Sequence, residues 1–499
     1  MRSLVVTRLC SFLILLIIAP PFSVAQSSAS SADGLANARE LFRKADFRGA
    51  AAAFQKIIDT KPSPEAYSGL VRSWLKADDV KAADESSQKA LAALPDSALT
   101  HAARGDVLFR RGMISEAEDE YQTAFKLDDK SCRAWLGQGK VDEIYTRHKK
   151  SREAIAKAHE LDPEDGDALY EWAIRQPFPD SVAALEKHLA NYHDDAEQER
   201  HEREYKELIK ALAGRKVWIL AHDIDHTEIK MELLTIGANF SRRGFGLRVR
   251  LNDRATATLL LDTGSSGVVI TRKLAEKIGA HKLSEQSIEG VGKSGPAAGY
   301  KALVDKITIG DLEFHDCLIQ ATPREIPEVD GVIGADVFSS YLINLNISAH
   351  KLQLEPLPAD SDPISSKDTE AFTHAFTFGH FLLVPTGVGK KEVGLFVIDS
   401  GSNANTISPE QAGLIPQMRA YNMPMSGASG SVNSAFVADN ATLRFARVNR
   451  KEERISTVDL HSISKDLGVE ISGQLGFAAM DGMKVIINYR DGLVQFTGK

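Results

Sequence analysis

The sequence TLLLDTGSS at residues 258–266 ends an apolar run in an acidic residue and a glycine-containing turn. Residues 395–402 read LFVIDSGS and repeat this pattern 137 residues later. Each apolar run predicts a buried strand that places a carboxylate, Asp262 or Asp399, on a tight turn. Glycine in each turn lets the backbone approach closely. The repeat predicts two similar β-rich lobes that each contribute one aspartate to a shared site.

A second repeated element follows each copy and supports the duplication. Residues 330–334 read DGVIG, and residues 472–476 read SGQLG. We therefore expect lobe 1 over residues 236–356 and lobe 2 over residues 373–499. The stretch 357–372 is rich in Pro, Asp and Ser, which is typical of an exposed linker.

Two carboxylates brought together by a pseudo-twofold axis define a specific chemistry. Like charges at short range cannot both ionise easily, so the pair shares one proton and titrates as a unit. A water held between them can lose a proton to the ionised carboxylate and attack a carbonyl carbon. The protonated carboxyl polarises that carbonyl. This chemistry needs no metal and no cofactor, so we expect none.

Residues 236–499 resemble the aspartic peptidases of the pepsin and retropepsin kind, especially bacterial retropepsin-like proteins. The resemblance implies closed β-barrel-like lobes, with Asp262 and Asp399 as the catalytic pair. It also implies that Thr263 and Ser400 clamp the two turns to each other. The full set of supporting turn residues is Thr263, Gly264, Ser265, Ser400, Gly401 and Ser402. A hairpin over the cleft is expected around Gly292, Gly295 and Tyr300. Both aspartates lie in one chain, so the resemblance leaves open a competent monomer or a homodimer.

The first half of the chain repeats with a period of about 34 residues. Ala50, Ala83, Ala117 and Ser151 follow this spacing. Small residues at a fixed offset in such a period predict stacked antiparallel helix pairs. The pattern resembles the tetratricopeptide repeat, and we expect a helical solenoid over residues 33–215. Such an array offers a concave surface to a peptide or partner protein. The alternative is that it only spaces or stabilises the rest of the chain.

The N-terminus indicates export. Arg2 and Arg8 precede an apolar run over residues 9–19, and small residues at 23–25 suit a cleavage site. This is the pattern of a secretory signal peptide over residues 1–25. We expect a bacterial protein that is periplasmic or secreted, with an uncleaved anchor as the alternative.

The remaining signals favour no other chemistry. A net charge of −8 argues against a nucleic-acid partner. Three cysteines are too few for a disulfide-stapled scaffold. The glycines at 290–295 match a dinucleotide loop only in spacing, and the His and Asp residues at 222–226 suit a solvated linker better than a metal site. The sequence thus predicts an exported aspartic endopeptidase with a repeat module that recruits a peptide or protein. The alternative is an inactive peptide-binding or scaffold protein with the same fold.

Overall fold

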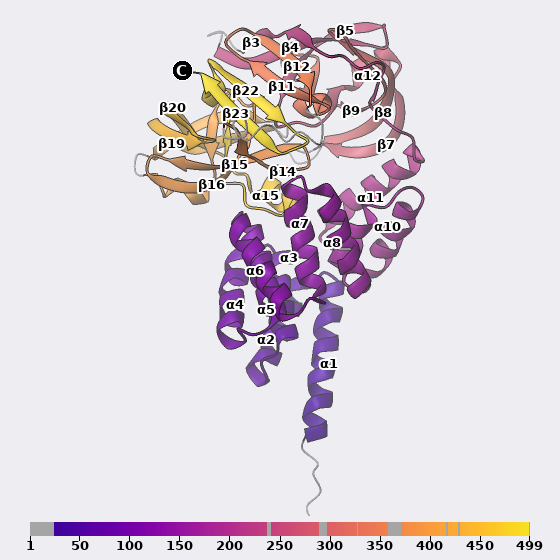
Figure 1. The fold of residues 1–499 in the computed structure, drawn as a ribbon, viewed down its shortest axis with the longest axis vertical. Coiled ribbons are helices and arrows are strands. Elements are labelled where there is room, and N and C mark those ends of the chain that lie inside the picture. Colours follow the sequence, from indigo (N-terminus) through magenta and orange to yellow (C-terminus); the bar gives the residue numbers. More distant parts are fainter. Residues whose placement is uncertain are drawn as a thin grey trace, which may run out of the picture.

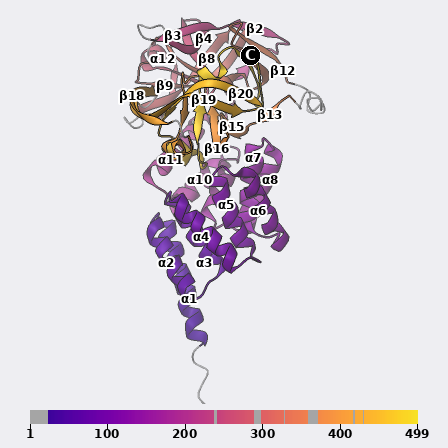
Figure 2. The same cartoon turned by 90° about the vertical axis from the view of Figure 1, so that its left-hand side faces the viewer.

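The structure is a computed structural model that describes residues 24–236, 241–288, 297–326, 328–357, 371–415, 418–427 and 430–498. A helical region occupies one end of the molecule and a β-rich region the other, and the start of α1 projects from the helical end away from the β-rich region (Figures 1 and 2). The predicted fold class is confirmed: an all-α solenoid of the tetratricopeptide type precedes an all-β two-lobed unit.

The helical region is a series of antiparallel helices that pack in pairs. Small residues allow the close approach, because a side chain at Gly105 or Gly137 would overlap the buried ring of Tyr121. Polar N-caps such as Asp46 and Ser63 accept hydrogen bonds from the first turn of the following helix. The helices are α1 (Val24–Arg43), α2 (Phe47–Thr60), α3 (Pro64–Lys76), α4 (Val80–Ala93), α5 (Ala98–Arg110), α6 (Ile114–Leu127), α7 (Cys132–Ile144), α8 (His148–Leu161), α9 (Gly166–Ala173), α10 (Asp180–Asn191) and α11 (Ala196–Leu212).

The array curls until early and late helices touch. Arg72 on α3 contacts Asp165 and Asp167 at the start of α9, each at 3.0 Å. Lys76 reaches Asp194 at 2.6 Å. Because residues about 95 positions apart meet here, the face formed by α3, α7 and α9 is the inner face of the solenoid, and ion pairs cross it.

Lobe 1 is a closed barrel. Its strands follow the order β9-β6-β10-β5-β4-β8, and β8 pairs again with β9 to close the ring. β1 and β3 join at the side, and β7 extends the sheet beyond β8. The elements are β1 (Ile219–Leu220), β3 (Glu232–Ile236), β4 (Ser241–Leu251), β5 (Ala255–Asp262), β6 (Val268–Thr271), α12 (Arg272–Ile278), β7 (His281–Ile288), β8 (Ala297–Ile309), β9 (Leu312–Thr322), β10 (Gly331–Gly334) and η1 (Ala335–Phe338).

Lobe 2 closes in the same way. The order β15-β16-β21-β17-β20-β19 returns to β15, with β14 and β18 at the ends. The elements are β14 (Phe376–Phe378), β15 (Phe381–Val388), β16 (Lys391–Ile398), β17 (Asn405–Ile407), α14 (Pro409–Ala412), β18 (Arg419–Gly427), β19 (Gly430–Phe445), β20 (Val448–Thr457), α15 (His461–Leu467), β21 (Gly473–Leu475) and α16 (Phe477–Met480).

A third sheet joins the lobes. Its central pair is β11–β22, in which Ile343 lies opposite Ile487. A single apolar cluster of buried residues runs through both lobes and this sheet. Cys132 and Cys317 are both free, so no disulfide joins the lobes among the described residues. The shared core holds the lobes together instead. The strands are β2 (Thr227–Lys230), β11 (Tyr341–Asn346), β12 (Lys351–Pro356), β13 (Thr373–His374), β22 (Met483–Asn488) and β23 (Leu493–Gly498).

The β-rich region begins earlier than residue 236, the predicted start of lobe 1. β1 pairs with β9, and β2 pairs with β12 of the interlobe sheet. The predicted linker over 357–372 falls almost wholly outside the described residues, as does the predicted signal over 1–25. Among the described helices, none combines the length and apolarity needed to cross a membrane.

The helical region docks on lobe 2. Leu108, Ile114 and Ile144 share an apolar cluster with Leu395 and Ile471 of that lobe. Backbone contacts fix the position: the Glu470 N–H donates to the Arg110 carbonyl at 2.7 Å. The edges of the middle repeats therefore bury apolar surface of the β-rich region.

Candidate active site

The two repeated motifs meet at the junction of the lobes. In lobe 1, β10 runs parallel to β5, so that Gly334 lies beside Asp262. In lobe 2, β21 runs parallel to β16 in the matching arrangement, with Leu475 beside Ile398. Each aspartate thus lies where a buried strand ends, and each is held by the second repeated element of its own lobe.

A reciprocal clamp joins the two turns. The Thr263 N–H donates to Ser400 Oγ at 3.0 Å, and the Ser400 N–H donates to Thr263 Oγ1 at 2.9 Å. Each hydroxyl then donates across the junction, Thr263 to the Ile398 carbonyl at 2.8 Å and Ser400 to the Leu261 carbonyl at 3.0 Å. All four groups are buried, so each of these polar atoms depends on its partner in the other lobe.

One backbone amide contacts both carboxyl groups. The Gly401 N–H lies 3.2 Å from Asp262 Oδ1 and 3.1 Å from Asp399 Oδ1. The Gly264 N–H adds a bond of 2.7 Å to Asp262 Oδ1. Neither glycine has room for a side chain, because a Cβ on Gly401 would lie 2.3 Å from the Asp262 carboxyl carbon. The structure therefore brings Asp262 and Asp399 side by side.

The surroundings of the two carboxyls are not equivalent. Burial and then the charge of Asp399 raise the pKa of Asp262 well above its usual value. Burial also raises the pKa of Asp399, but the Ser402 N–H, the hydrogen bond with Asp262 and the Gly401 N–H act in the opposite direction. The pair titrates as a unit, and the hydrogen bonds favour the charge on Asp399 and the shared proton on Asp262, because the Gly401 and Ser402 N–H groups both donate to Asp399 Oδ1.

Gln474 adds to this asymmetry. Its Nε2 donates to Asp399 Oδ2 at 2.9 Å, and its Oε1 accepts from Thr406 Oγ1 at 3.0 Å. Val332 occupies the matching position in lobe 1. Gln474 was not among the predicted site residues, although a polar residue within an otherwise apolar motif was the signal that could have identified it.

Asp336 is a second residue that the sequence analysis missed. Its carboxylate accepts hydrogen bonds from the Gly267 N–H at 2.9 Å and from Ser266 Oγ at 2.7 Å. It therefore braces the turn that begins at Asp262. Ser265 lies in the same turn, where its N–H approaches the Asp262 carbonyl at 3.4 Å.

The predicted hairpin residues have different outcomes. Gly292 and Gly295 lie outside the described residues. Tyr300 lies on β8, and its ring contacts the cationic groups of Arg272 and Lys282. No hydrogen bond or ring contact joins Tyr300 to either aspartate in the described part of the chain.

One cluster of described residues has the spacing of metal ligands: Cys132, Asp162 and Asp165. Burial raises the pKa of the Cys132 thiol to about 12, so the thiol stays protonated. The Asp165 carboxylate is already paired with Arg72 and Arg133. The donor set therefore does not suit a cation.

Comparisons with known proteins agree with this geometry. Residues 247–337 match the family model for aspartyl proteases. The matched stretch includes Asp262 and most of the lobe 1 barrel. Residues 23–146 match the model for a tetratricopeptide repeat-like domain. In the sequence, an aspartyl protease-like region thus follows a tetratricopeptide repeat-like region.

Two solved structures are each similar to one part of the chain. An aspartic proteinase from Irpex lacteus is 11% identical over 55% of this chain and 97% of its own, with a TM-score of 0.36. A thermophilic TPR protein from Thermus thermophilus is 18% identical over 35% of this chain and 96% of its own, with a TM-score of 0.28. A search of curated proteins finds no match.

Proposed function

We propose that the protein is an aspartic-type endopeptidase that hydrolyses peptide bonds with a water activated between Asp262 and Asp399. The observation that carries the proposal is the Gly401 amide within hydrogen-bond distance of both carboxyls. Two buried carboxyls with raised pKa values and one shared proton are suited to acid–base catalysis.

We propose a different role for each aspartate, because their surroundings are unequal. Asp399 accepts a proton from the water, whose oxygen attacks the peptide carbonyl carbon. Asp262 gives its proton to the carbonyl oxygen, which forms a neutral tetrahedral diol. Asp399 then returns its proton to the leaving nitrogen, while Asp262 recovers a proton from a diol hydroxyl as the carbon–nitrogen bond breaks. The pair ends with one proton, as it began.

We further propose that one chain is sufficient for activity. Both aspartates and both halves of the clamp belong to the same chain, and the interlobe sheet joins its lobes. The basic and apolar N-terminal stretch supports export to the periplasm or medium.

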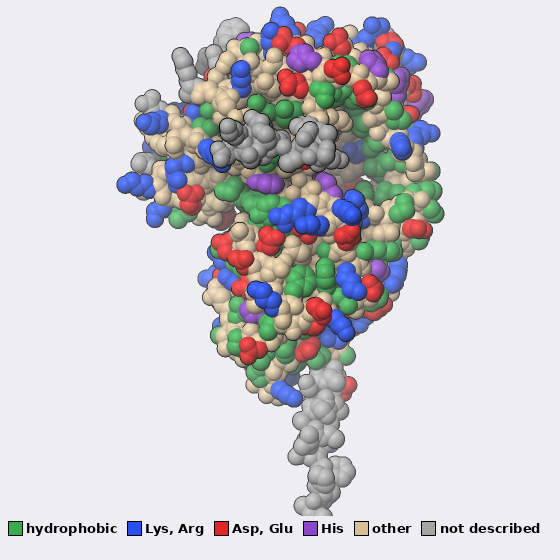
Figure 3. All heavy atoms as spheres, in the orientation of Figure 1, with side chains coloured by type: hydrophobic (Ala, Val, Ile, Leu, Met, Phe, Trp, Pro, Cys, Tyr) green, Lys and Arg blue, Asp and Glu red, His purple; other side chains and the backbone are tan. Residues whose placement is uncertain are grey.

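The repeat region is better suited to holding the lobes than to offering an open inner groove. Ion pairs of Arg72 and Arg133 with Asp165 and Asp167 cross its inner face. On the face seen in Figure 3, basic and acidic side chains are intermixed over the helices. We propose that the repeats support the peptidase region and that a protein partner, where one binds, uses the outer surface.

The decisive test is cleavage of an unfolded protein by the mature chain between pH 3 and 8, beside Asp262→Asn and Asp399→Asn. Each substitution keeps the shape of the side chain and removes its acid–base function, so we expect a loss of at least about a thousandfold in kcat. Cleavage that survives in both variants would rule out the mechanism. A correctly folded parent that binds peptide without cleaving it would favour the inactive binding protein.

A further inference from the structure

Helix α11 is the last helix of the repeat region and contacts both lobes. At its N-terminal end, Asp195 and Glu197 lie 3.0 and 3.7 Å from Lys465 Nζ on α15 of lobe 2. Further along, Glu204 reaches strand β7 of lobe 1. One helix thus connects the lobe that carries Asp262 to the lobe that carries Asp399.

Glu204 makes the contact with lobe 1 through its carboxylate. Its two oxygens accept from the Ser287 N–H at 3.0 Å and from Ser287 Oγ at 2.7 Å. The Gln286 Nε2 approaches the same carboxylate at 3.4 Å. Among the described strands, β7 pairs only with β8. Glu204 therefore supplies an acceptor that a neighbouring strand would otherwise provide.

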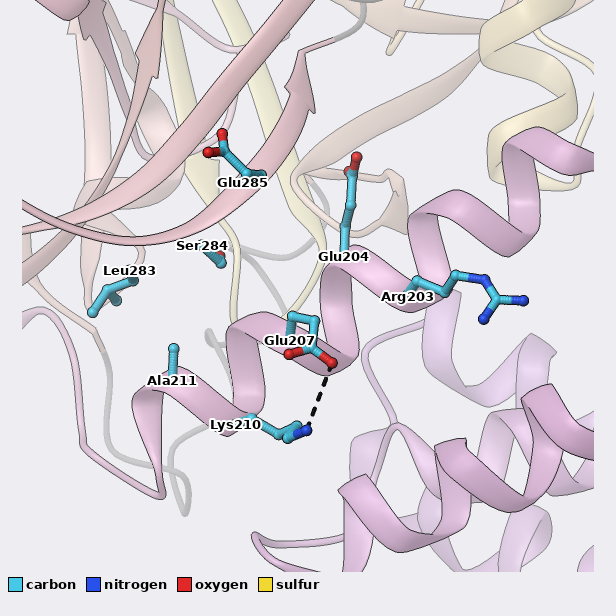
Figure 4. Close-up of a pocket in the computed structure, with 8 residues that line it drawn as sticks. All are labelled: Arg203, Glu204, Glu207, Lys210, Ala211, Leu283, Ser284 and Glu285. Atoms are coloured by element: carbon cyan, nitrogen blue, oxygen red, sulfur yellow. Dashed lines mark ion pairs between the residues drawn. The ribbon is translucent and has the colours of Figure 1, made fainter.

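A hollow of about 620 Å³ lies beside this contact and is lined by residues of α11 and β7. Figure 4 shows the side chains that line it. In that view Glu204 points towards the sheet, whereas Glu207 pairs with Lys210 along the helix. Ser284 Oγ borders the hollow and is buried with no hydrogen-bond partner among the described residues. Among the described residues, Glu204 therefore makes the side-chain hydrogen bonds from α11 to β7.

Each of the two contacts of α11 is connected to one aspartate through paired strands. β7 pairs with β8, β8 with β4, and β4 with β5, which ends in Asp262. In lobe 2, α15 precedes Ser472, whose N–H donates to the Leu395 carbonyl on β16, the strand before Asp399. A change in the tilt between the lobes would alter the spacing of the two carboxyls.

We infer that Glu204 is a positioning residue, which acts through α11 to fix the two lobes relative to each other and so sets the spacing of the Asp262 and Asp399 carboxyls. The inference rests on the proposed function for its kinetic consequence. Its structural consequence is independent of activity.

The kinetic test compares Glu204→Ala and Glu204→Gln with Glu207→Gln in the full mature chain. Glu207→Gln is the matched control, because it removes the same charge from the same helix and the same hollow without a bond to β7. We expect Glu204→Ala to lower kcat about tenfold with little change in KM. The limbs of its pH profile should approach each other by about half a unit, because more distant carboxyls interact less. Glu204→Gln keeps one acceptor and should lie between the parent and Glu204→Ala.

Unchanged limbs in Glu204→Ala, in a variant that melts like the parent, would overturn the inference and leave Glu204 a structural anchor. An equal effect in Glu207→Gln would also overturn it, because charge alone would then explain the loss.

A distance measurement decides the inference even if the parent proves inactive. Spin labels at the exposed positions Lys277 in lobe 1 and Lys390 in lobe 2 report the interlobe distance, in a chain with Cys132→Ser. We expect a broader distance distribution in Glu204→Ala and an unchanged one in Glu207→Gln. An unchanged distribution in both would refute the positioning role, whereas absent cleavage by the parent would refute only the proposed function.

Discussion

Replacing Gln474 by Met tests whether the asymmetry of the aspartates comes from the amide that donates to Asp399. Met matches Gln in volume and carries no N–H donor. The lost bond measures 2.9 Å, and a hydrogen bond to a charged group contributes about 1.5–3 kcal/mol. Since one pKa unit corresponds to about 1.4 kcal/mol, the pKa for protonation of Asp399 should rise by about one to two units.

This rise has a defined consequence for activity. In the proposed mechanism no cleavage occurs when both carboxyls are protonated, so the acidic limb of kcat/KM should move to higher pH by about one to two units. Cleavage of an unfolded substrate between pH 3 and 8 measures the shift. Thr406→Val is the control, because it removes the hydroxyl that orients Gln474 but keeps the amide, and we expect a smaller shift. An acidic limb that stays in place in Gln474→Met, with full activity on the plateau, would refute the reasoning.

Two further predictions concern stability. Thr263→Val removes the hydroxyl that accepts from the Ser400 N–H and donates to the Ile398 carbonyl. Both buried groups then lack a partner, so the free energy of unfolding, measured by urea titration, should fall by about 2–5 kcal/mol. Asp167→Asn breaks contacts with Arg72 and Arg133 and should cost about 3 kcal/mol at pH 7. Lys76 and both arginines hold the pKa of Asp167 well below its usual 3.8, so its contribution is present above pH 3.8 and is lost as the pH falls further. A difference between parent and Asp167→Asn that stays constant from pH 7 to pH 3 would contradict this account.

The parts of the site that could be predicted from sequence are those that repeat locally. An apolar run followed by Asp262 or Asp399 fixes a strand and its turn, and the second repeated element identifies the strand beside it. The chain carries each signal twice, and both copies form the same parallel pairs. The clamp of Thr263 with Ser400 followed only from the resemblance to a known family, because no spacing rule indicates which hydroxyl crosses between lobes.

The remaining contacts depend on distant segments. β2 is a short strand, and its partner β12 lies more than 100 positions later, so no period marks it. The bond between Gln474 and Asp399 requires knowing which face of β21 meets the aspartate. The pairing of Arg72 with Asp167 depends on the curvature of the whole array. Each of these features is set by tertiary packing rather than by local pattern.

The absence of disulfides bears on how the repeat region and the lobes depend on each other. Cys132 and Cys317 are free and lie in different regions, so non-covalent contacts hold the described part of the chain together. The aspartates require their lobes in register, and the interlobe sheet supplies part of that constraint. The edges of the repeats add a further constraint on the lobes. Leu395 lies three residues before Ile398 on β16 and packs against Gly112 of the repeats. The strand that ends at the turn of Asp399 is thus covered by the helices. The repeat region is therefore part of the support of the site, which explains why the two regions share one apolar interface rather than a flexible tether.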